Sequence, residues 1–237
     1  MDVNRLLNEF LGPKTGGSAQ SGQASARQSG LPGGLAGGAA AGGLVALVLG
    51  TKKGRKLGGK ALKYGGLAAV GGLAYKAYRD WQTQQPSGQE ADPLSLPRPP
   101  ADSGFDLEND TDASGQDFRL SVMQAMISAA KSDDHIDADE HARIHARIED
   151  LGLGASEKAA MFDYFAAPAD PVATAQLART TEQKAEIYLA SALAIDPDTA
   201  QEQAYLDALS NALDLPQGLR GHLDMEAAAA RRQAEMA

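Results

Sequence analysis

The segment MQAMISAAKSDDHIDADE, residues 123–140, joins two predicted helices through an acidic turn and decides the fold class of this chain. Apolar residues recur every four positions from Phe118 onward and predict a helix that ends near Ser132. Asp137 opens the next helix, because Glu140 follows it at the spacing of a capping box, in which the two side chains satisfy backbone groups at the helix start. The segment therefore indicates an all-α domain.

The same helical pattern continues to the end of the chain without a strand signal. Further helices are predicted to begin at Ser156, at Asp170 with Pro171, at Thr181, at Thr199 and at Pro216. Together these starts predict a bundle of about seven helices over residues 114–237.

Two of the predicted helices resemble each other, which indicates an internal repeat. Aligning Glu140 with Glu202 superposes apolar residues on apolar residues and polar helix starts on each other: Ile144 on Leu206, Leu151 on Leu213, Leu153 on Leu215, Asp137 on Thr199 and Asp134 on Asp196. Amphipathic helices also align in this way by chance. A true repeat predicts a pseudo-symmetric bundle whose acidic turns, residues 133–140 and 196–202, are equivalent and close together.

Residues 82–113 contain prolines, glycines and acidic residues but few apolar ones. A segment of this composition cannot bury enough apolar surface to fold alone, which predicts a disordered acidic linker. The linker separates the helical domain from the part of the chain that precedes it.

An uncharged stretch, LPGGLAGGAAAGGLVALVLG, occupies residues 31–50. A helix of this length reaches ~30 Å, about the thickness of the hydrocarbon core of a bilayer, so the stretch is predicted to be a transmembrane helix. The residues expected in contact with the membrane are Leu31, Gly34, Gly38, Gly42, Leu44, Val45, Leu47, Val48 and Leu49. Glycines four apart also suit close packing between two such helices, as in a homo-oligomer. A flexible Gly/Ala linker is the competing interpretation.

A basic run follows the apolar stretch at once. Its side chains, which we expect at lipid headgroups, are Lys52, Lys53, Arg55, Lys56, Lys60 and Lys63. Residues 57–81 then either lie along the headgroups or cross as a second span, with Lys76 and Arg79 reaching outward. A single span is favoured, because lysines beside so short an apolar core are costly in lipid. The positive-inside rule then places the C-terminal domain in the cytoplasm, whereas a hairpin places it outside.

The chain opens with MDVNRLLNEFLG, whose apolar residues at helical spacing predict a short amphipathic helix over residues 1–12. So short a helix is not stable alone, so we expect it to form against a membrane surface or a partner. Residues 13–30 are rich in Gly, Ser, Gln and Ala and predict a flexible linker.

The acidic turn offers hard oxygen ligands for Ca²⁺ or Mg²⁺. The candidate ligands are Asp133, Asp134, Asp137, Asp139 and Glu140. The EF-hand spacing is absent, since Ala138 stands where that loop needs glycine, and a capping box beside solvated acids is the alternative interpretation. His141 and His145 lie four apart, but they have neither the HExxH order nor an evident third ligand for Zn²⁺.

Residues 123–140 resemble the hallmark of the TerB-like fold of tellurite-resistance and related bacterial proteins: a helix ending Ala-Ala-Lys, an acidic turn, then Ile-Asp-x-x-Glu. The order of segments, with AIDPDTAQEQAYLDALSNALDLP at residues 194–216, is similar to the YebE-type family of bacterial inner-membrane proteins of unknown function. This resemblance implies a TerB-like helical domain anchored at the inner membrane, and an association with metal binding and stress-response assemblies. His135 stands where the family turn commonly carries glycine, which weakens the implied metal role.

The sequence contains no motif for catalysis. It has no cysteine, no Walker loop and no GxSxG, and a net charge of −9 argues against nucleic acid as a partner. We expect a non-catalytic inner-membrane protein whose tethered domain docks another protein or serves a stress response, with Ca²⁺, Mg²⁺ or Zn²⁺ as a modulator. The alternative is a glycine-zipper membrane assembly that oligomerises through its Gly-rich segments.

Overall fold

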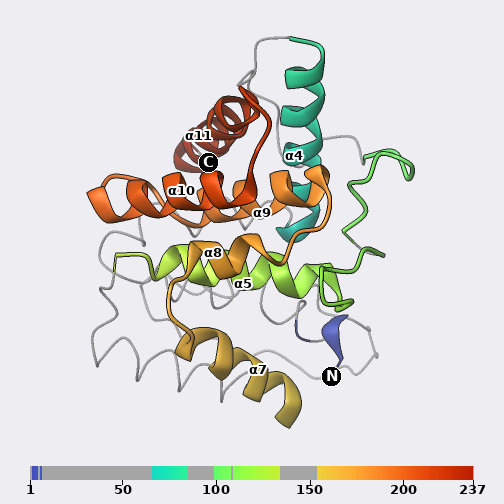
Figure 1. The fold of residues 1–237 in the computed structure, drawn as a ribbon, viewed down its shortest axis with the longest axis vertical. Coiled ribbons are helices and arrows are strands. Elements are labelled where there is room, and N and C mark those ends of the chain that lie inside the picture. Colours follow the sequence, from blue (N-terminus) through green and yellow to red (C-terminus); the bar gives the residue numbers. More distant parts are fainter. Residues whose placement is uncertain are drawn as a thin grey trace, which may run out of the picture.

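The computed structural model of the chain describes residues 2–4, 6, 66–84, 99–107, 109–133 and 154–236, and the regular structure among them is helical (Figure 1). The longer helices are α4 (Gly66–Gln82), α5 (Phe118–Ala130), α7 (Ala155–Ala166), α8 (Pro171–Ala175), α9 (Thr181–Ala194), α10 (Ala200–Leu213) and α11 (Leu219–Met236). Within the described residues, the prediction of an all-α fold is confirmed. The predicted helix that opens at Asp137 lies outside them.

Helix α9 is the centre of the bundle. It packs most extensively against α5 and also contacts α4, α10 and α11. It is buried on all its faces from Ala185 to Ala194, a run of mostly small and apolar residues that also holds Glu186. Figure 1 shows α4 and α11 side by side at one end of the molecule and α7 at the other.

Several helix starts follow the predicted capping chemistry. Asp170 accepts hydrogen bonds from two backbone N–H groups with Pro171 at the first helical position, and Thr199 forms a capping box with Glu202. The predicted cap at Ser156 is wrong: Gly154 precedes α7, and Ser156 lies inside its first turn. Gly154 takes an extended conformation without any side-chain cap, so the helix begins one residue before Ser156.

Helix α4 belongs to the helical domain, so the prediction that residues 57–81 lie along lipid headgroups or cross the membrane is wrong for residues 66–81, whereas residues 57–65 lie outside the described residues. Among the described residues of that stretch, Val70, Leu73, Ala74 and Ala77 are buried against α9 and α11. These four positions form one narrow apolar stripe at helical spacing. None of the helices in the described ranges combines the length and the apolar character needed to cross a bilayer.

Part of the predicted disordered linker is also folded onto the domain. Phe105 is 4% exposed and packs edge-on against Tyr75 and Tyr78 of α4, at ring centroid distances of 5.6 and 5.3 Å. Leu107 is buried beside it. Asp112 then accepts bonds from the backbone of two residues and from two serine hydroxyls, which fixes the approach to α5. The linker prediction failed here because Phe105 and Leu107 pack against α4, which is distant in the sequence, and no local sequence pattern indicates this contact.

The N-terminal residues dock on their own domain. Leu6 is 0% exposed in the main core, and Val3 packs against the same core. Arg119, at the start of α5, donates to Oδ1 of Asn4 at 2.8 Å. The described part of the predicted amphipathic helix therefore forms against this chain itself, where we expected a membrane or another protein.

Three predicted segments lie outside the described residues: the flexible linker 13–30, the membrane stretch 31–50 and the basic run 51–63. All the predicted membrane and headgroup side chains belong to these segments. Their roles stay predictions.

Candidate functional site

The acidic turn after α5 is described only at its start. Of the five candidate cation ligands, Asp133 is described and half-buried, whereas Asp134, Asp137, Asp139 and Glu140 lie outside the described residues. Where the structure does describe the chain, no cluster of three or more Asp, Glu or His side chains is arranged to hold a metal ion. Cation binding at this turn therefore stays a prediction.

Its predicted counterpart, the turn before α10, is described in full. The Thr199 hydroxyl accepts from the backbone N–H of Glu202, and the Glu202 carboxylate accepts from the backbone N–H of Thr199 at 3.1 Å. Each of the two side chains thus accepts a hydrogen bond from the other residue's backbone N–H, which would otherwise lack a partner in the first helical turn. The carboxylate of Glu202 is therefore engaged in holding the helix start.

Asp133, the described start of the first acidic turn, acts on the turn before α10. Burial raises the pKa of Glu202, hydrogen bonds from Thr199 oppose this, and the charges of Asp198 and Asp133 raise the pKa further. The charge of Asp133 is the smallest of these influences on Glu202. The helices that precede the two turns, α5 and α9, pack together, but residues 134–140 lie outside the described residues, so the proximity of the two turns stays a prediction.

Three described acids act together at the start of α10. Asp133 from one turn and Asp198 from the other add to the charge of Glu202. Clustered carboxylates attract cations and basic segments of other proteins, and they repel nucleic acid.

Lys131, which closes the Ala-Ala-Lys of the predicted motif, has a structural role. Its ammonium group donates to the backbone carbonyls of Phe165 and Ala167 at the end of α7. A helix end leaves carbonyl groups without internal partners, and a cation there stabilises them. Lys131 therefore ties α7 to the end of α5.

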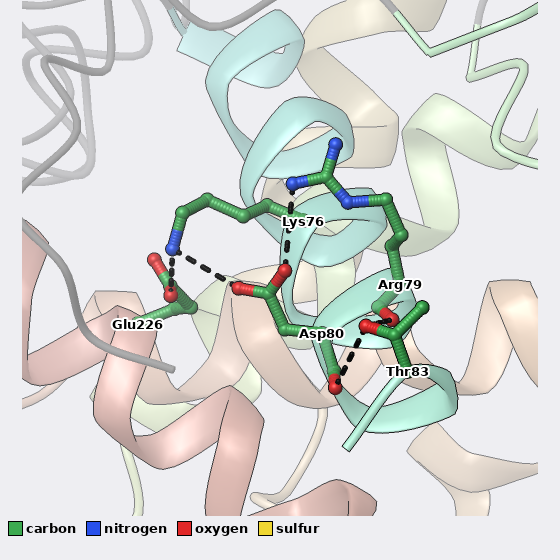
Figure 2. A network of polar contacts seen from close by, with 5 residues as sticks. All are labelled: Lys76, Arg79, Asp80, Thr83 and Glu226. Carbon is green, nitrogen blue, oxygen red and sulfur yellow. Dashed lines mark hydrogen bonds and ion pairs between the residues drawn. The ribbon is translucent and has the colours of Figure 1, made fainter. Parts of the chain in front are cut away.

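A second polar cluster joins α4 to α11 (Figure 2). The Lys76 ammonium group contacts the Glu226 carboxylate of α11 and lies 3.4 Å from Asp80 on its own helix. Both acids are buried, Glu226 at 1% and Asp80 at 5% exposure. Arg79 also reaches Asp80, at 3.4 Å. A positive side chain between two buried carboxylates holds α4 in place.

Sequence reasoning missed this cluster by placing Lys76 and Arg79 at a membrane surface. The signal that could have found it is the spacing of Lys76 and Asp80, four apart on one helix face. Glu226 carried no local signal, because its partner is 150 positions away in the sequence.

The helical arrangement can now be set beside known proteins. The model of a family described as "Protein of unknown function (DUF533)" matches residues 34–227, which include all of α5, α7, α8, α9 and α10. An uncharacterised protein in the ampR 5′ region of Yersinia enterocolitica is 30% identical over 105 residues, which cover 44% of this chain and 76% of that protein. No solved structure matches the chain. By this match the protein belongs to the DUF533 family, a TerB-like family of unknown function.

Proposed function

We propose that this protein is a non-catalytic helical module, held at a membrane by its apolar stretch, which presents a negative surface to a basic partner. The observation that carries the proposal is the burial of Leu6 and of α4 in one hydrophobic core. The apolar stretch 31–50 and the basic run 51–63 lie between these two anchors in the sequence.

Both anchors constrain how the intervening chain can meet a bilayer. A single crossing by residues 31–50 would put Leu6 and α4 on opposite sides of the membrane. Leu6, fully buried, and Asn4, bonded to Arg119, would then lose their contacts with the domain. A hairpin whose second pass is residues 57–81 would remove α4 from the bundle. We therefore propose that the apolar stretch enters and leaves the bilayer on the side of the domain, next to the basic run.

The partner surface in this proposal is the pair of acidic turns. Asp133 and Asp198 act on Glu202 across the two turns, so their charges form one field. A basic segment of another protein fits this field. A divalent cation, with Asp133 among its ligands, would tune the same surface.

Cross-linking in membranes tests the proposed topology, because the chain has no native cysteine. In the full-length protein, cysteines at Asn4 and Arg119, a pair in contact, should be joined within one chain by a short bismaleimide. The cross-linked protein should also stay in the membrane after an alkaline carbonate wash. A matched control pairs Asn4→Cys with Met225→Cys, because Met225 is 42% exposed on α11, and Figure 1 shows α11 and the N-terminus at opposite ends of the molecule.

Each result decides between the readings. Protein released by carbonate overturns the membrane association. Protein that resists carbonate but gives no cross-link between positions 4 and 119 favours a single membrane crossing by residues 31–50. Cross-links between chains in place of those within one chain favour the glycine-zipper assembly.

A further inference from the structure

Glu186, in the middle of α9, is a buried carboxyl group that no site described above uses. Its side chain is 0% exposed, and neither of its carboxyl oxygens has a hydrogen-bond partner. Glutamate is almost never fully buried without a partner, because the charged form loses its hydration and gains nothing in return. Such a group in a native fold calls for an explanation.

The carboxyl group lies against the backbone of α4. A methyl group added at Gly71 would lie 3.5 Å from Oε1 of Glu186 and 3.0 Å from Cδ1 of Leu107. Glycine at this position therefore lets α4 approach α9 directly over the carboxyl group. Leu107 closes the site from the segment that precedes α5.

The charges that act on Glu186 are all negative. They come from Asp110 and Asp106, on the segment that carries Leu107, and from Glu182, one turn earlier on α9. The charge of Glu182 also acts on Tyr78 of α4, and Arg179 acts on Asp110. The surroundings of Glu186 thus combine desolvation with like charge, and both disfavour its ionised form.

The cations on neighbouring helices are engaged with other groups. Among the described residues, Lys76 of α4 contacts Glu226, Arg119 of α5 contacts Asp117, and Arg220 and Arg231 of α11 contact Asp207 and the Ala192 carbonyl. None of these cations is among the groups that act on Glu186.

We propose that Glu186 must keep its proton for α4 to stay docked on α9, so that loss of this proton releases α4 from the bundle. The unpartnered carboxyl group, its contact with α4 at Gly71 and its acidic surroundings all support this role. The device is a pH-dependent latch within the helical domain, and it does not depend on the proposed membrane association.

The direction of the pH effect follows from proton binding. Burial, with the charges of Asp110, Glu182 and Asp106, raises the pKa of Glu186 well above its ordinary value. The docked state therefore holds a proton that the undocked state has lost. Docking weakens as the pH rises above about 4.3, the ordinary value for glutamic acid, and the loss stops once the pH passes the raised pKa. Across this window the ratio of docked to undocked α4 falls by up to about tenfold per pH unit.

Trp81 reports the position of α4 directly. It is the single tryptophan of the chain, it lies near the end of α4, and its indole N–H donates to the carbonyl of Gln217 at 3.0 Å. Release of α4 would break this bond and expose the ring to water. The fluorescence of full-length protein in neutral detergent should shift to longer wavelength between pH 5.5 and 9, and iodide should quench it more strongly.

Three variants test the assignment to Glu186. Glu186→Gln, which cannot ionise, should abolish the pH-dependent shift, and Glu186→Met serves the same purpose if the buried amide prevents folding. Glu202→Gln is the matched control, because Glu202 is another acid with a raised pKa, but it is only half-buried and caps α10. The control should titrate like the parent protein.

The proposal is overturned by a parent protein whose Trp81 signal does not change over this pH range. It is also overturned if Glu186→Gln and Glu186→Met titrate like the parent. A shift that is lost in Glu202→Gln as well would show that the signal reports the whole bundle, and it would equally reject a role specific to Glu186.

Discussion

Two buried carboxyl groups contact α4, and they are held in opposite ways. Glu226 of α11 is 1% exposed and lies against the Lys76 ammonium group. Glu186 of α9 is 0% exposed, and its oxygens have no partner. A buried charge is tolerated when a countercharge replaces its lost hydration, whereas an unpaired acid shifts its pKa and stays neutral.

This difference separates a permanent attachment of α4 from a conditional one. The contact with α11 is an ion pair, which requires Glu226 to be charged. The contact with α9 requires Glu186 to be neutral. One helix is thus fixed along one side by charge and along the other by the absence of charge, and the two attachments should respond to mutation in opposite directions.

Removing the positive charge should have the largest effect. Lys76→Met would leave Glu226 and Asp80 buried without their shared cation, which makes the α11 side resemble the α9 side. Breaking a buried pair in this way costs about 3–5 kcal/mol, a large share of the stability of a small domain. Urea unfolding at pH 7, followed by circular dichroism, measures the loss.

The matched control removes the acid as well. Lys76→Met combined with Glu226→Met replaces the ion pair by apolar side chains of similar size and should recover most of the stability. Arg79 remains beside Asp80 in both variants. A single Lys76→Met variant that loses less than about 1 kcal/mol, as an exposed pair would, would contradict a buried ion pair.

Local chemistry made part of this fold predictable. The cap at Thr199 was predicted from Glu202, only three positions away in the sequence. The structure confirms this cap. The same holds for Asp170 with Pro171. Helical spacing also predicted the buried face of α5, since Phe118, Val122 and Met126 are all buried.

The place of α4 could not be predicted in the same way. A glycine-rich helix with a small, uncharged face suits close packing in a membrane and close packing in a bundle alike. What decides between them is the partner, and Glu226 and Phe105 are distant in the sequence. Glu186 was equally hidden, because nothing near it distinguishes a buried glutamate from an exposed one on an amphipathic helix. The candidate cation ligands show the opposite problem: their composition was visible, but four of the five lie outside the described residues.

An intermediate effect should appear when the two acids are neutralised separately. At pH 8, Glu226→Gln should destabilise the protein by ~2 kcal/mol, because Lys76 loses a charged partner and keeps only Asp80. Glu186→Gln should instead gain stability relative to the parent as the pH rises from 5 to 8, because the parent must hold a proton at the higher pH. Urea unfolding of both variants at the two pH values measures the contrast. Changes of the same sign at pH 8 would show that the two acids are held alike.

The smallest effect should come from the end of α4. Trp81→Phe removes the hydrogen bond to the Gln217 carbonyl but keeps an aromatic ring beside Tyr78, whose centroid lies 5.5 Å from that of Trp81. The bond lies at the surface, where water can replace it, so the loss should be about 0.5–1 kcal/mol.

Thr83→Ala is the matched control, since the Thr83 hydroxyl makes an exposed bond to the Arg79 carbonyl within the same helix end. In urea unfolding at pH 7, Thr83→Ala should lose no more stability than Trp81→Phe. Both variants should lose far less than Lys76→Met. A loss above about 2 kcal/mol in Trp81→Phe would mean that the end of α4 holds the helix as strongly as a buried charge does, and the two carboxyl groups would then not be its main attachments.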